Sequence, residues 1–332
     1  MTTVFLTHDP EALENYYGKT ALAALRELAE VRLNPKDGLL GTDELIAAAR
    51  GCALIVGDVN TPAEAAVFDA LPDLVAFHRC AVDRRTIDVE AASRNGVLVT
   101  NASPGFVNSV TELIFGLMVD LARGITAAVA TYRESAMPPQ RMGVQLAGAT
   151  LGILGYGSIG TFTAEVGRAL GMTVLVCDPY KTVAAPGIRQ STMDEVLAKS
   201  DFVVCLVVAN EATRHLMNAD AFARMKRNAF FINVARPLLV DEAALEAALA
   251  GGRIAGAALD VGSGPAMTPP SALARLPNVI ATPHIGGLTP AATHAQALET
   301  VEQARAVLAG RMPHNALDPE HAHRFTSFAE RS

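Results

Sequence analysis

The 332-residue chain has no tryptophan, few cysteines and no excess of basic residues. A formal charge of −7 argues against nucleic acid as a partner, because phosphates require a basic face. The four cysteines form no Cys-x-x-Cys pair, which argues against a zinc site or a disulfide framework. The longest apolar run, Phe202 to Ala209, is too short to span a membrane, and the amino-terminus lacks the basic start of a signal peptide. We therefore expect a soluble, cytoplasmic protein that binds no metal, nucleic acid or membrane.

Short apolar runs alternate with stretches of helical period, which is the pattern of parallel sheets covered by helices. The alternation occurs twice, and the length fits two domains of about 150 residues each. An apolar helix from about Ser109 to Ala130 and a linker from Arg133 to Gln145 lie between the two arrays, and a helix from about Pro290 to Leu308 closes the chain. We predict strands at residues 4–6, 53–56, 74–77 and 97–99 in the first array, and at 151–154, 173–177, 202–208, 230–234, 254–259 and 279–281 in the second.

A Gly-x-Gly-x-x-Gly motif, Gly155 to Gly160, directly follows a predicted strand and opens a helix. Such a turn lets the backbone approach a pyrophosphate at the positive end of the helix. Asp178 ends the next strand, 23 residues after Gly155, where a carboxylate accepts the ribose hydroxyls of NAD and repels the 2′-phosphate of NADP. Lys181 and Arg189 keep NADP as the alternative, and a purely structural glycine turn is the alternative to a nucleotide site.

Two residues stand just beyond strand ends, where ligands of parallel α/β sheets bind. Arg236 follows the strand at 230–234 and could grip a carboxylate with both arms of its guanidinium. His284 follows the strand at 279–281 and could exchange a proton near neutral pH. Alone, either residue is more often a surface charge or a structural histidine. Together with a nucleotide site, they predict hydride transfer to or from a small acid.

These segments resemble the D-isomer-specific 2-hydroxyacid dehydrogenase family. The resemblance covers most of the chain. It rests on the glycine turn with Asp178 and on three further segments in the family's order: Phe231-Ile232-Asn233-Val234-Ala235-Arg236, Gly256-Ala257-Ala258-Leu259-Asp260-Val261 and Ala281-Thr282-Pro283-His284-Ile285-Gly286-Gly287. The segment Thr213-Arg214-His215-Leu216 resembles the family pattern more weakly. Each segment alone is moderately specific, and their shared order makes the set highly specific.

The resemblance implies two Rossmann- or flavodoxin-like parallel-sheet domains with an active-site cleft between them. Residues 1–101 and 289–332 would form an interrupted substrate-binding domain, and residues 102–288 would form the NAD-binding domain between its halves. It also implies a homodimer built around the helix that starts near Ser109.

By the same resemblance, Arg236 holds the substrate carboxylate, His284 protonates the carbonyl oxygen during reduction, and Asp260 contacts the nicotinamide carboxamide. The expected cofactor contacts are Gly155, Tyr156, Gly157, Ser158, Ile159, Gly160, Asp178, Thr213, Val234, Ala235, Arg236, Asp260, His284 and Gly287. The expected substrate contacts are Arg79, Ala81, Val82, Arg236 and His284.

The chain also departs from the family pattern. The family's carboxylate partner of the catalytic histidine is missing, because Gly264 stands before the proline and no Asp or Glu occurs between Asp260 and Glu299. We therefore expect His284 to carry its charge only at lower pH and to be held less rigidly. Asp83 stands where a glycine is usual; it either opposes an acidic substrate or points to solvent and pairs with Arg84 or Arg85, which we favour. Pro237 restricts Arg236 to extended geometry.

The sequence thus predicts an NAD-dependent dehydrogenase that acts on a small 2-hydroxy or 2-oxo acid. The alternative is a non-catalytic NAD(H)-binding sensor or scaffold. The missing carboxylate partner and the altered loop around Asp83 keep that alternative open.

Overall fold

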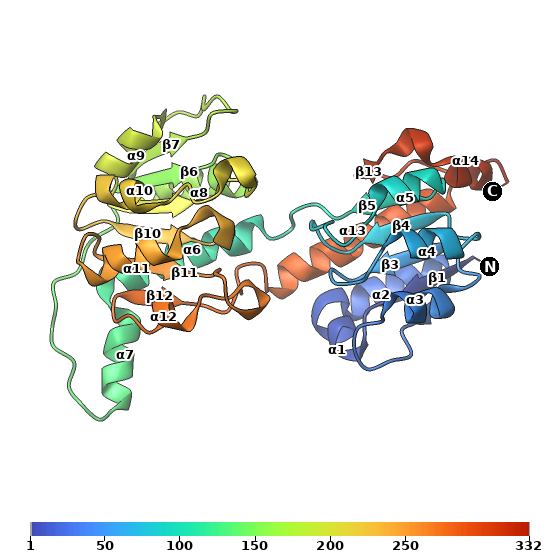
Figure 1. Ribbon diagram of the computed structural model, residues 1–332, viewed down its shortest axis with the longest axis horizontal. Coiled ribbons are helices and arrows are strands. Elements are labelled where there is room, and N and C mark those ends of the chain that lie inside the picture. Colours follow the sequence, from blue (N-terminus) through green and yellow to red (C-terminus); the bar gives the residue numbers. More distant parts are fainter. Residues whose placement is uncertain (1, 332) are drawn as a thin grey trace. The chain divides into compact units, whose positions relative to one another are not determined.

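The computed structural model describes residues 2–331, which divide into two compact units (Figure 1). Unit 1 combines the chain up to Phe106 with the chain from Leu288 onward, and unit 2 is the intervening segment Val107–Gly287. The boundaries expected from the sequence, at 101/102 and 288/289, lie within five residues of these. Unit 2 is therefore an insertion into unit 1.

Unit 1 is built on a six-stranded sheet whose strand order is β13-β5-β4-β3-β1-β2. Neighbouring strands are parallel except at the β13–β5 edge, which is antiparallel. The strands are β1 (Thr3–Leu6), β2 (Glu30–Leu33), β3 (Leu54–Gly57), β4 (Ala76–Arg79), β5 (Leu98–Asn101) and β13 (Ala316–Leu317). Because β3 and β4 are buried along their whole length, helices must cover both faces.

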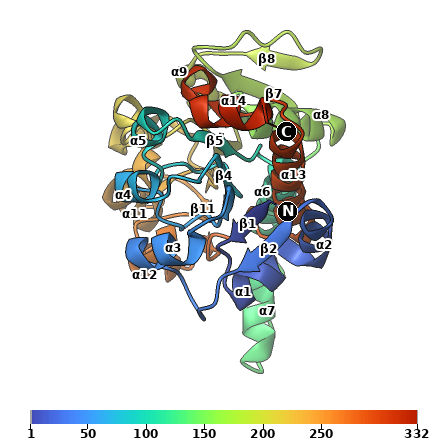
Figure 2. The same ribbon diagram turned by 90° about the vertical axis from the view of Figure 1, so that its right-hand side faces the viewer.

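Helices pack on the two faces of this sheet in two groups (Figure 2). One group contains α2 (Gly18–Leu28) and α13 (Pro290–Leu308), which pack against each other, and the other contains α3 (Thr42–Ala49), α4 (Ala65–Ala70) and α5 (Val89–Arg94). The short helices α1 (Pro10–Ala12) and α14 (His323–Ala329) complete the unit. The expected return of the last long helix to the first array is confirmed, since Ala297 and Val301 share a core with Val4 and Leu25.

Unit 2 is built on a seven-stranded parallel sheet with the order β12-β11-β10-β9-β6-β7-β8. The strands are β6 (Thr150–Leu154), β7 (Thr173–Cys177), β8 (Ile188–Gln190), β9 (Phe202–Cys205), β10 (Phe230–Asn233), β11 (Gly256–Leu259) and β12 (Val279–Ala281). The chain runs outward from β6 to β8 and then returns to β9, on the other side of β6. This reversal between β6 and β9 is the place where open parallel sheets bind ligands.

The helices of unit 2 also form two groups, one on each face of the sheet. On one face α6 (Val107–Arg123) packs against α8 (Ser158–Ala169); the other carries α9 (Met193–Lys199), α10 (Ala219–Arg224), α11 (Glu242–Ala250) and α12 (Ser271–Ala274). Buried side chains such as Val203, Phe222 and Phe231 fill the core on that second face.

The long helix expected from Ser109 to Ala130 is two helices, so that prediction is wrong in its extent. α6 ends at Arg123, and α7 (Ile125–Arg133) leaves it at an angle of 66°. The break occurs because Gly124 adopts a left-handed conformation with φ 65°, which glycine reaches without steric cost. Among the described residues no single helix meets the length and apolarity needed to cross a membrane, and only α6 and α7 taken together pass that test.

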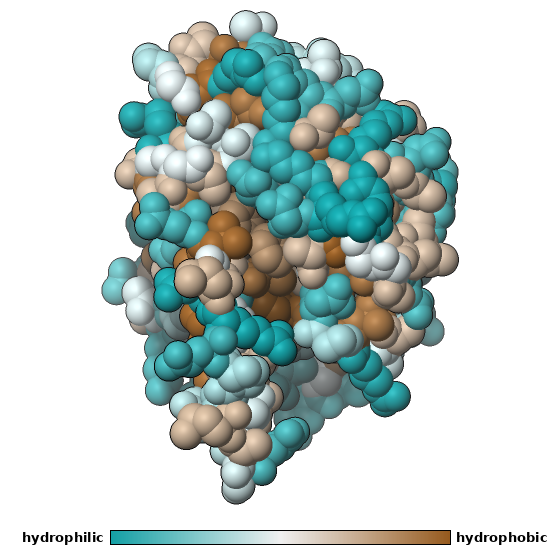
Figure 3. All heavy atoms as spheres, turned by 90° about the vertical axis from the view of Figure 1, so that its left-hand side faces the viewer, coloured by the Kyte–Doolittle hydropathy of each residue, from teal (hydrophilic) through white to brown (hydrophobic). Residues whose placement is uncertain are grey.

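Apolar side chains remain exposed along α7 and the segment that follows it. Helix α7 has no buried residue, and Ile125, Val129 and Tyr132 are 48%, 41% and 60% exposed. On the face of the molecule drawn in Figure 3, hydrophilic and apolar side chains are interspersed, and apolar side chains also gather in a recess near the middle. An amphipathic helix normally buries its apolar stripe, so α7 lacks a covering surface within the described chain.

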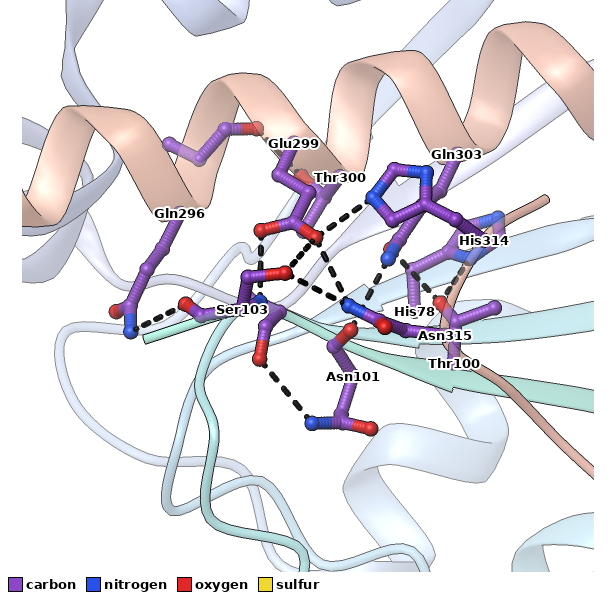
Figure 4. A network of polar contacts seen from close by, with 12 residues as sticks. His78, Thr100, Asn101, Ser103, Gln296, Glu299, Thr300, Gln303, His314 and Asn315 are labelled. Atoms are coloured by element: carbon purple, nitrogen blue, oxygen red, sulfur yellow. Dashed lines mark hydrogen bonds and ion pairs between the residues drawn. The ribbon is translucent and has the colours of Figure 1, made fainter. Parts of the chain in front are cut away.

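A polar network in unit 1 joins the end of β5 to α13 (Figure 4). The carboxylate of Glu299 accepts hydrogen bonds from Ser103 N (2.7 Å) and Oγ (2.8 Å), His314 Nε2 (2.6 Å) and Asn315 Nδ2 (3.0 Å). Gln296 Nε2 also reaches Ser103 O at 3.5 Å. Ser103 thereby holds the start of the segment that leaves unit 1 for unit 2.

A buried chain of hydrogen bonds continues this network into the sheet. Thr100 Oγ1 donates to Gln303 Oε1 (2.7 Å), so it must accept from His78 Nδ1, which lies 2.8 Å away (Figure 4). His78 therefore carries its proton on Nδ1, and its Nε2 is buried without a hydrogen-bond partner among the described residues. Burial lowers the pKa of His78 to about 3, and burial likewise lowers the pKa of His8.

Unit 1 should lose stability as the pH falls below 6.5. The unfolded chain then binds a proton at position 78, whereas the folded chain does not until the pH approaches 3. One such histidine removes about 1.4 kcal/mol of unfolding free energy per pH unit, or about 2 kcal/mol between pH 6.5 and 5. Urea unfolding is measured at these two pH values. Mass spectrometry of peptides from unit 1 assigns the change in unfolding free energy to that unit.

The matched control for this prediction is His78→Asn, which keeps a donor for Thr100 but cannot ionise. The difference in unfolding free energy between pH 6.5 and 5 should shrink by about 2 kcal/mol in this variant. An equal pH dependence in the two proteins would show that His78 contributes nothing to it.

Candidate active site

The phosphate-binding motif forms a tight turn between β6 and α8. Gly155 has φ +97°, its N–H donates to Cys177 O at 2.8 Å, and a Cβ there would lie 2.6 Å from Leu206 O. A Cβ on Gly160 would lie 2.2 Å from Gly155 O. Both glycines are therefore required by close packing of turn, helix and sheet.

Gly157 differs from the other two glycines, because a Cβ there would meet no atom within 4 Å. It lies immediately before α8, whose first-turn N–H groups have no acceptor within the helix. The open space in front of these donors is a cradle that a side chain would fill. The residues present thus fit a pyrophosphate held by the helix N-terminus.

Gly157→Ala should leave the fold intact and weaken NADH binding by about tenfold or more, because the added methyl group occupies the space the pyrophosphate needs. Gly160→Ala is the contrasting variant, and its clash with Gly155 O should lower the melting temperature. Thermal unfolding and NADH titration by fluorescence measure both effects. Wild-type NADH affinity in Gly157→Ala would contradict a pyrophosphate at this turn.

Asp178 lies at the end of β7, beside the glycine turn. Its carboxylate accepts hydrogen bonds from Tyr156 N (2.7 Å), Tyr180 N (2.8 Å) and Lys181 N (3.1 Å). Burial raises the pKa of Asp178, but these backbone donors together with the Lys181 charge outweigh it and hold the pKa below its usual range. The group is therefore a fixed anion next to the turn. Arg189, by contrast, forms an ion pair with Glu195 at 2.9 Å.

Arg236 lies in a turn after β10 that is held by a buried side chain. Asn233 Oδ1 accepts from Ala235 N (3.1 Å), and Asn233 Nδ2 donates to Arg236 O (3.2 Å). Arg236 has φ −148° and ψ 148°, which confirms the extended geometry expected before Pro237. Its guanidinium is exposed and donates to Ala235 O at 2.7 Å. The turn thus presents a cation at the carboxyl end of the strand.

Asp260, at the end of β11, holds the turn that carries His284. The buried carboxylate accepts from Thr282 Oγ1 (2.7 Å), Ile285 N (2.8 Å) and Gly286 N (2.8 Å). His284 has φ +57°, a left-handed conformation that costs a non-glycine residue of order 1 kcal/mol. These three bonds keep the turn closed around that residue. Both carboxylate oxygens therefore have backbone partners, in addition to any nicotinamide contact that the resemblance implies.

The half-buried imidazole of His284 has a backbone partner in place of the missing carboxylate. Its Nδ1 lies 3.3 Å from Ala266 O, in the loop after β11. Ser263, in the same loop, donates its N–H and Oγ to the carboxylate of Glu242 at 2.8 and 2.5 Å. Neither Ala266 nor Glu242 is predicted as a site residue from the sequence. A backbone carbonyl leaves no trace in residue type, whereas Glu242 lies six residues after the family segment that ends at Arg236, and its carboxylate is a signal for a loop anchor.

Arg236 and His284 extend from the same edge of the unit 2 sheet. β10 and β12 are parallel to β11 and lie on either side of it, so their ends are two strand spacings, or about 10 Å, apart. That spacing accommodates a small molecule between the two strand ends. Convergence of the two side chains on one substrate remains a prediction.

Arg79, expected to contact substrate, is fully buried in unit 1. Its guanidinium donates to Asp58 O, to Thr61 O (2.9 Å) and to Thr86 Oγ1 (2.7 Å). Burial lowers the pKa of Arg79 to about 10. These contacts make Arg79 an internal brace between the loops that follow β3 and β4, so a direct contact of its guanidinium with substrate is not proposed.

The loop after β4 also contains Ala81, Val82 and Asp83. Ala81 is buried, and Val82 O accepts from Asn101 Nδ2 at 3.4 Å. Asp83 pairs with Arg85 through contacts of 2.5 to 3.1 Å, which confirms the pairing favoured from the sequence. Substrate contacts of Ala81 and Val82 stay predictions.

The remaining expected cofactor residues all lie in unit 2. Thr213 caps a short turn, and its hydroxyl donates to Val208 O at 2.8 Å. Tyr156 and Val234 are buried, Ser158 is exposed, and Ile159, Ala235 and Gly287 are half-buried. Their places after β6, β9, β10 and β12 put them at the carboxyl edge of the sheet. Their contacts with a cofactor stay predictions.

Comparison with known proteins agrees with these features. The family described as "D-isomer specific 2-hydroxyacid dehydrogenase, NAD binding domain" matches residues 115–286. The D-3-phosphoglycerate dehydrogenase of Methanocaldococcus jannaschii is 35% identical over 305 residues, which are 90% of this chain and 57% of that protein. The hydroxypyruvate reductase of Thermotoga maritima is 33% identical over 80% of this chain and 87% of its own length. This chain thus spans about half the length of the phosphoglycerate dehydrogenases it matches, from 48% to 57%.

The fold also has relatives among solved structures. The TT0316 protein from Thermus thermophilus superimposes with a TM-score of 0.84 and 30% sequence identity, over 95% of this chain and all of that one. D-2-Hydroxyisocaproate dehydrogenase superimposes with a TM-score of 0.85 at 21% identity, over 96% of this chain and 99% of that one. At that lower identity the likeness concerns the fold alone.

Proposed function

Because this chain belongs to the D-isomer specific 2-hydroxyacid dehydrogenase family, we propose that it transfers a hydride between NAD and a small 2-hydroxy or 2-oxo acid. The observation that carries the proposal is the shared edge of one parallel sheet. The phosphate cradle at Gly157 follows β6, the Arg236 cation follows β10, and the His284 imidazole follows β12. A nucleotide, an anion and a proton each have a place on that edge.

The proposed chemistry needs one cationic group that binds the substrate carboxylate and one group that exchanges a proton with the substrate oxygen. The nicotinamide would supply the hydride acceptor or donor. Arg236 binds the substrate carboxylate through two parallel hydrogen bonds, which orients C2. In oxidation His284 would take the hydroxyl proton, and in reduction the charged imidazole would return that proton to the carbonyl oxygen. Each turnover thus exchanges one hydride and one proton.

We favour NAD over NADP. The Asp178 carboxylate is fixed beside the glycine turn, where it would accept the ribose hydroxyls and repel a 2′-phosphate. Arg189, one of the two cations that could neutralise a 2′-phosphate, is paired with Glu195. Titration with NADH and NADPH tests the preference, and equal affinity for the two would contradict it.

The candidate substrates are 2-oxo acids with small side chains. The matched relatives are named for 3-phosphoglycerate, hydroxypyruvate and glyoxylate, and we propose the same chemical class here. The test is the absorbance of NADH with a panel containing glyoxylate, hydroxypyruvate, 3-phosphohydroxypyruvate and pyruvate. Turnover of at least one acid supports the proposal. Tight NADH binding without turnover of any acid would favour a non-catalytic NAD(H)-binding protein instead.

We also propose that two copies of the chain associate through α7 and the segment after it. The exposed apolar side chains Ile125, Val129 and Tyr132 continue into Met137, Met142 and Val144, which are 80%, 101% and 40% exposed. An uncovered apolar surface of this kind fits the interface of a two-fold dimer, in which the same surface of each copy covers the other. Sedimentation should give the mass of two chains, and the double variant Ile125→Asp, Val129→Asp should give the mass of one. A monomeric parent protein would contradict the proposal.

A further inference from the structure

We propose that the backbone carbonyl of Ala266 positions His284, in place of a carboxylate. The inference rests on the proposed role of His284 as acid and base. His284 Nδ1 lies 3.3 Å from Ala266 O, and a carbonyl oxygen can only accept a hydrogen bond. Nδ1 must therefore carry a proton in the neutral ring. This leaves Nε2 as the nitrogen that exchanges a proton with substrate.

The carbonyl is aimed by an unusual stretch of backbone. Ala266 and Met267 have φ values of 53° and 61°, a left-handed pair of non-glycine residues. Backbone hydrogen bonds close the loop around them: Gly262 N donates to Met267 O (2.8 Å) and Gly264 N donates to Thr268 O (2.8 Å). Such a conformation persists only where the surrounding contacts determine it. The direction of Ala266 O is thus fixed by the fold of the loop.

Both sides of the contact are anchored to the same sheet edge. On the loop side, Ser263 binds the Glu242 carboxylate at the start of α11 through its N–H and hydroxyl. On the histidine side, Asp260 holds the 282–286 turn through three hydrogen bonds. Glu242 is therefore a second positioning residue, which acts on His284 through the loop.

The loop has no room for the carboxylate that the family pattern would place here. A Cβ on Gly264 would lie 2.7 Å from Thr268 O, and a Cβ on Gly262 would lie 2.5 Å from Pro269 Cα. Any side chain at these positions would force the backbone to move. The carbonyl partner is thus a consequence of the loop conformation and replaces the carboxylate as orienting group.

The chemical difference between the two partners is charge. A carboxylate fixes the tautomer and adds a negative charge beside the ring, whereas a carbonyl fixes the tautomer with a neutral dipole. Nδ1 keeps its proton in both ionisation states of His284. The proton that the reaction consumes or releases therefore passes through Nε2 alone.

The direct test is the tautomer of His284 in the whole protein labelled with ¹⁵N-histidine. Long-range ¹H–¹⁵N correlation spectra at a pH where the ring is neutral distinguish Nδ1–H from Nε2–H, and His284→Asn assigns the signal by its loss. We expect the Nδ1–H form, although a free neutral imidazole prefers Nε2–H. An Nε2–H ring at position 284 would overturn the proposal.

Two pairs of variants test the loop. Proline at position 266 requires φ near −65°, so Ala266→Pro should turn the carbonyl away from His284. The ring should then shift toward the Nε2–H form, and kcat should fall about tenfold. Ala266→Gly allows the left-handed conformation and should keep the Nδ1–H signal. If Ala266→Pro does not fold, the tautomer of His284 is compared in Glu242→Ala and Glu242→Gln. Only glutamine retains an acceptor for Ser263, so only Glu242→Ala should release the loop. An unchanged tautomer in Ala266→Pro or Glu242→Ala contradicts the proposal.

Measuring the tautomer of His284 together with the turnover of 2-oxo acids separates the positioning role of Ala266 from the proposed dehydrogenase function. An Nδ1–H ring in a protein that turns over no 2-oxo acid would refute the dehydrogenase function and leave the contact with Ala266 intact. Turnover that depends on His284 with an Nε2–H ring would refute the positioning role alone.

Discussion

His284→Ala should lower kcat for reduction of the best 2-oxo acid by about 10²–10⁴-fold, the usual effect of removing a general acid. The imidazole is half-buried and follows β12 at the carboxyl edge of the unit 2 sheet, which is also the edge that carries the glycine turn. NADH affinity should change little, because the phosphate cradle and Asp178 remain. The measurements are steady-state NADH oxidation and NADH titration on the same preparation.

An exposed histidine supplies the control for this variant. The His321 side chain is 60% exposed in unit 1, and His321→Ala should keep wild-type kcat. If His284→Ala retained more than about a tenth of the wild-type kcat, with chemistry limiting the rate, His284 would not be the acid. Loss of NADH binding together with turnover would instead indicate that the variant has disturbed the turn.

Asp260→Ala should lower the unfolding free energy of unit 2 by about 3–5 kcal/mol, because it leaves Thr282 Oγ1, Ile285 N and Gly286 N without their acceptor. Asp260→Asn should cost about 1–3 kcal/mol, since one amide arm donates and opposes a backbone N–H. Both variants should also reduce kcat, because the turn that carries His284 loses its anchor. Urea unfolding and steady-state kinetics measure the two effects.

Thr282→Val is the matched control, since it removes one donor to Asp260 and leaves the two backbone donors in place. Its cost should be about 1 kcal/mol, less than that of either Asp260 variant. The resemblance gives Asp260 a contact with the nicotinamide carboxamide. A stable Asp260→Asn protein whose only defect is weak NADH binding would favour that contact over the anchoring role.

Much of the fold could be predicted because its strands are buried and its turns have a chemical signature. β7, β12 and α13 begin and end at the predicted residues. β2 was missed because it is an edge strand with alternate residues exposed, and β13 because two residues carry no periodicity. The bend between α6 and α7 depends on the left-handed conformation of Gly124, and a glycine within an apolar helical pattern does not by itself disclose that conformation.

The candidate site was predictable where residue type determines chemistry. Asp178 lies beside the glycine turn, and Arg236 and His284 follow strands of one sheet edge, as expected. Arg79 shows the limit of such reasoning, because its guanidinium suits an anion but is buried against carbonyl groups of the loop that follows β3. The Ala266 carbonyl shows another limit. Every residue has such an oxygen, and only backbone conformation selects the one that reaches His284.

The insertion of unit 2 into unit 1 has a consequence for biosynthesis. Val4 and Leu54 share their core with Val301 and Phe325, which the ribosome delivers only after the whole of unit 2. The apolar sheet face of the nascent amino-terminal segment therefore remains uncovered while unit 2 is synthesised and folds. Such intermediates are prone to aggregate. If translation stalls before α13, unit 2 is complete but unit 1 lacks its carboxyl-terminal helices. This is the species that chaperones would have to retain.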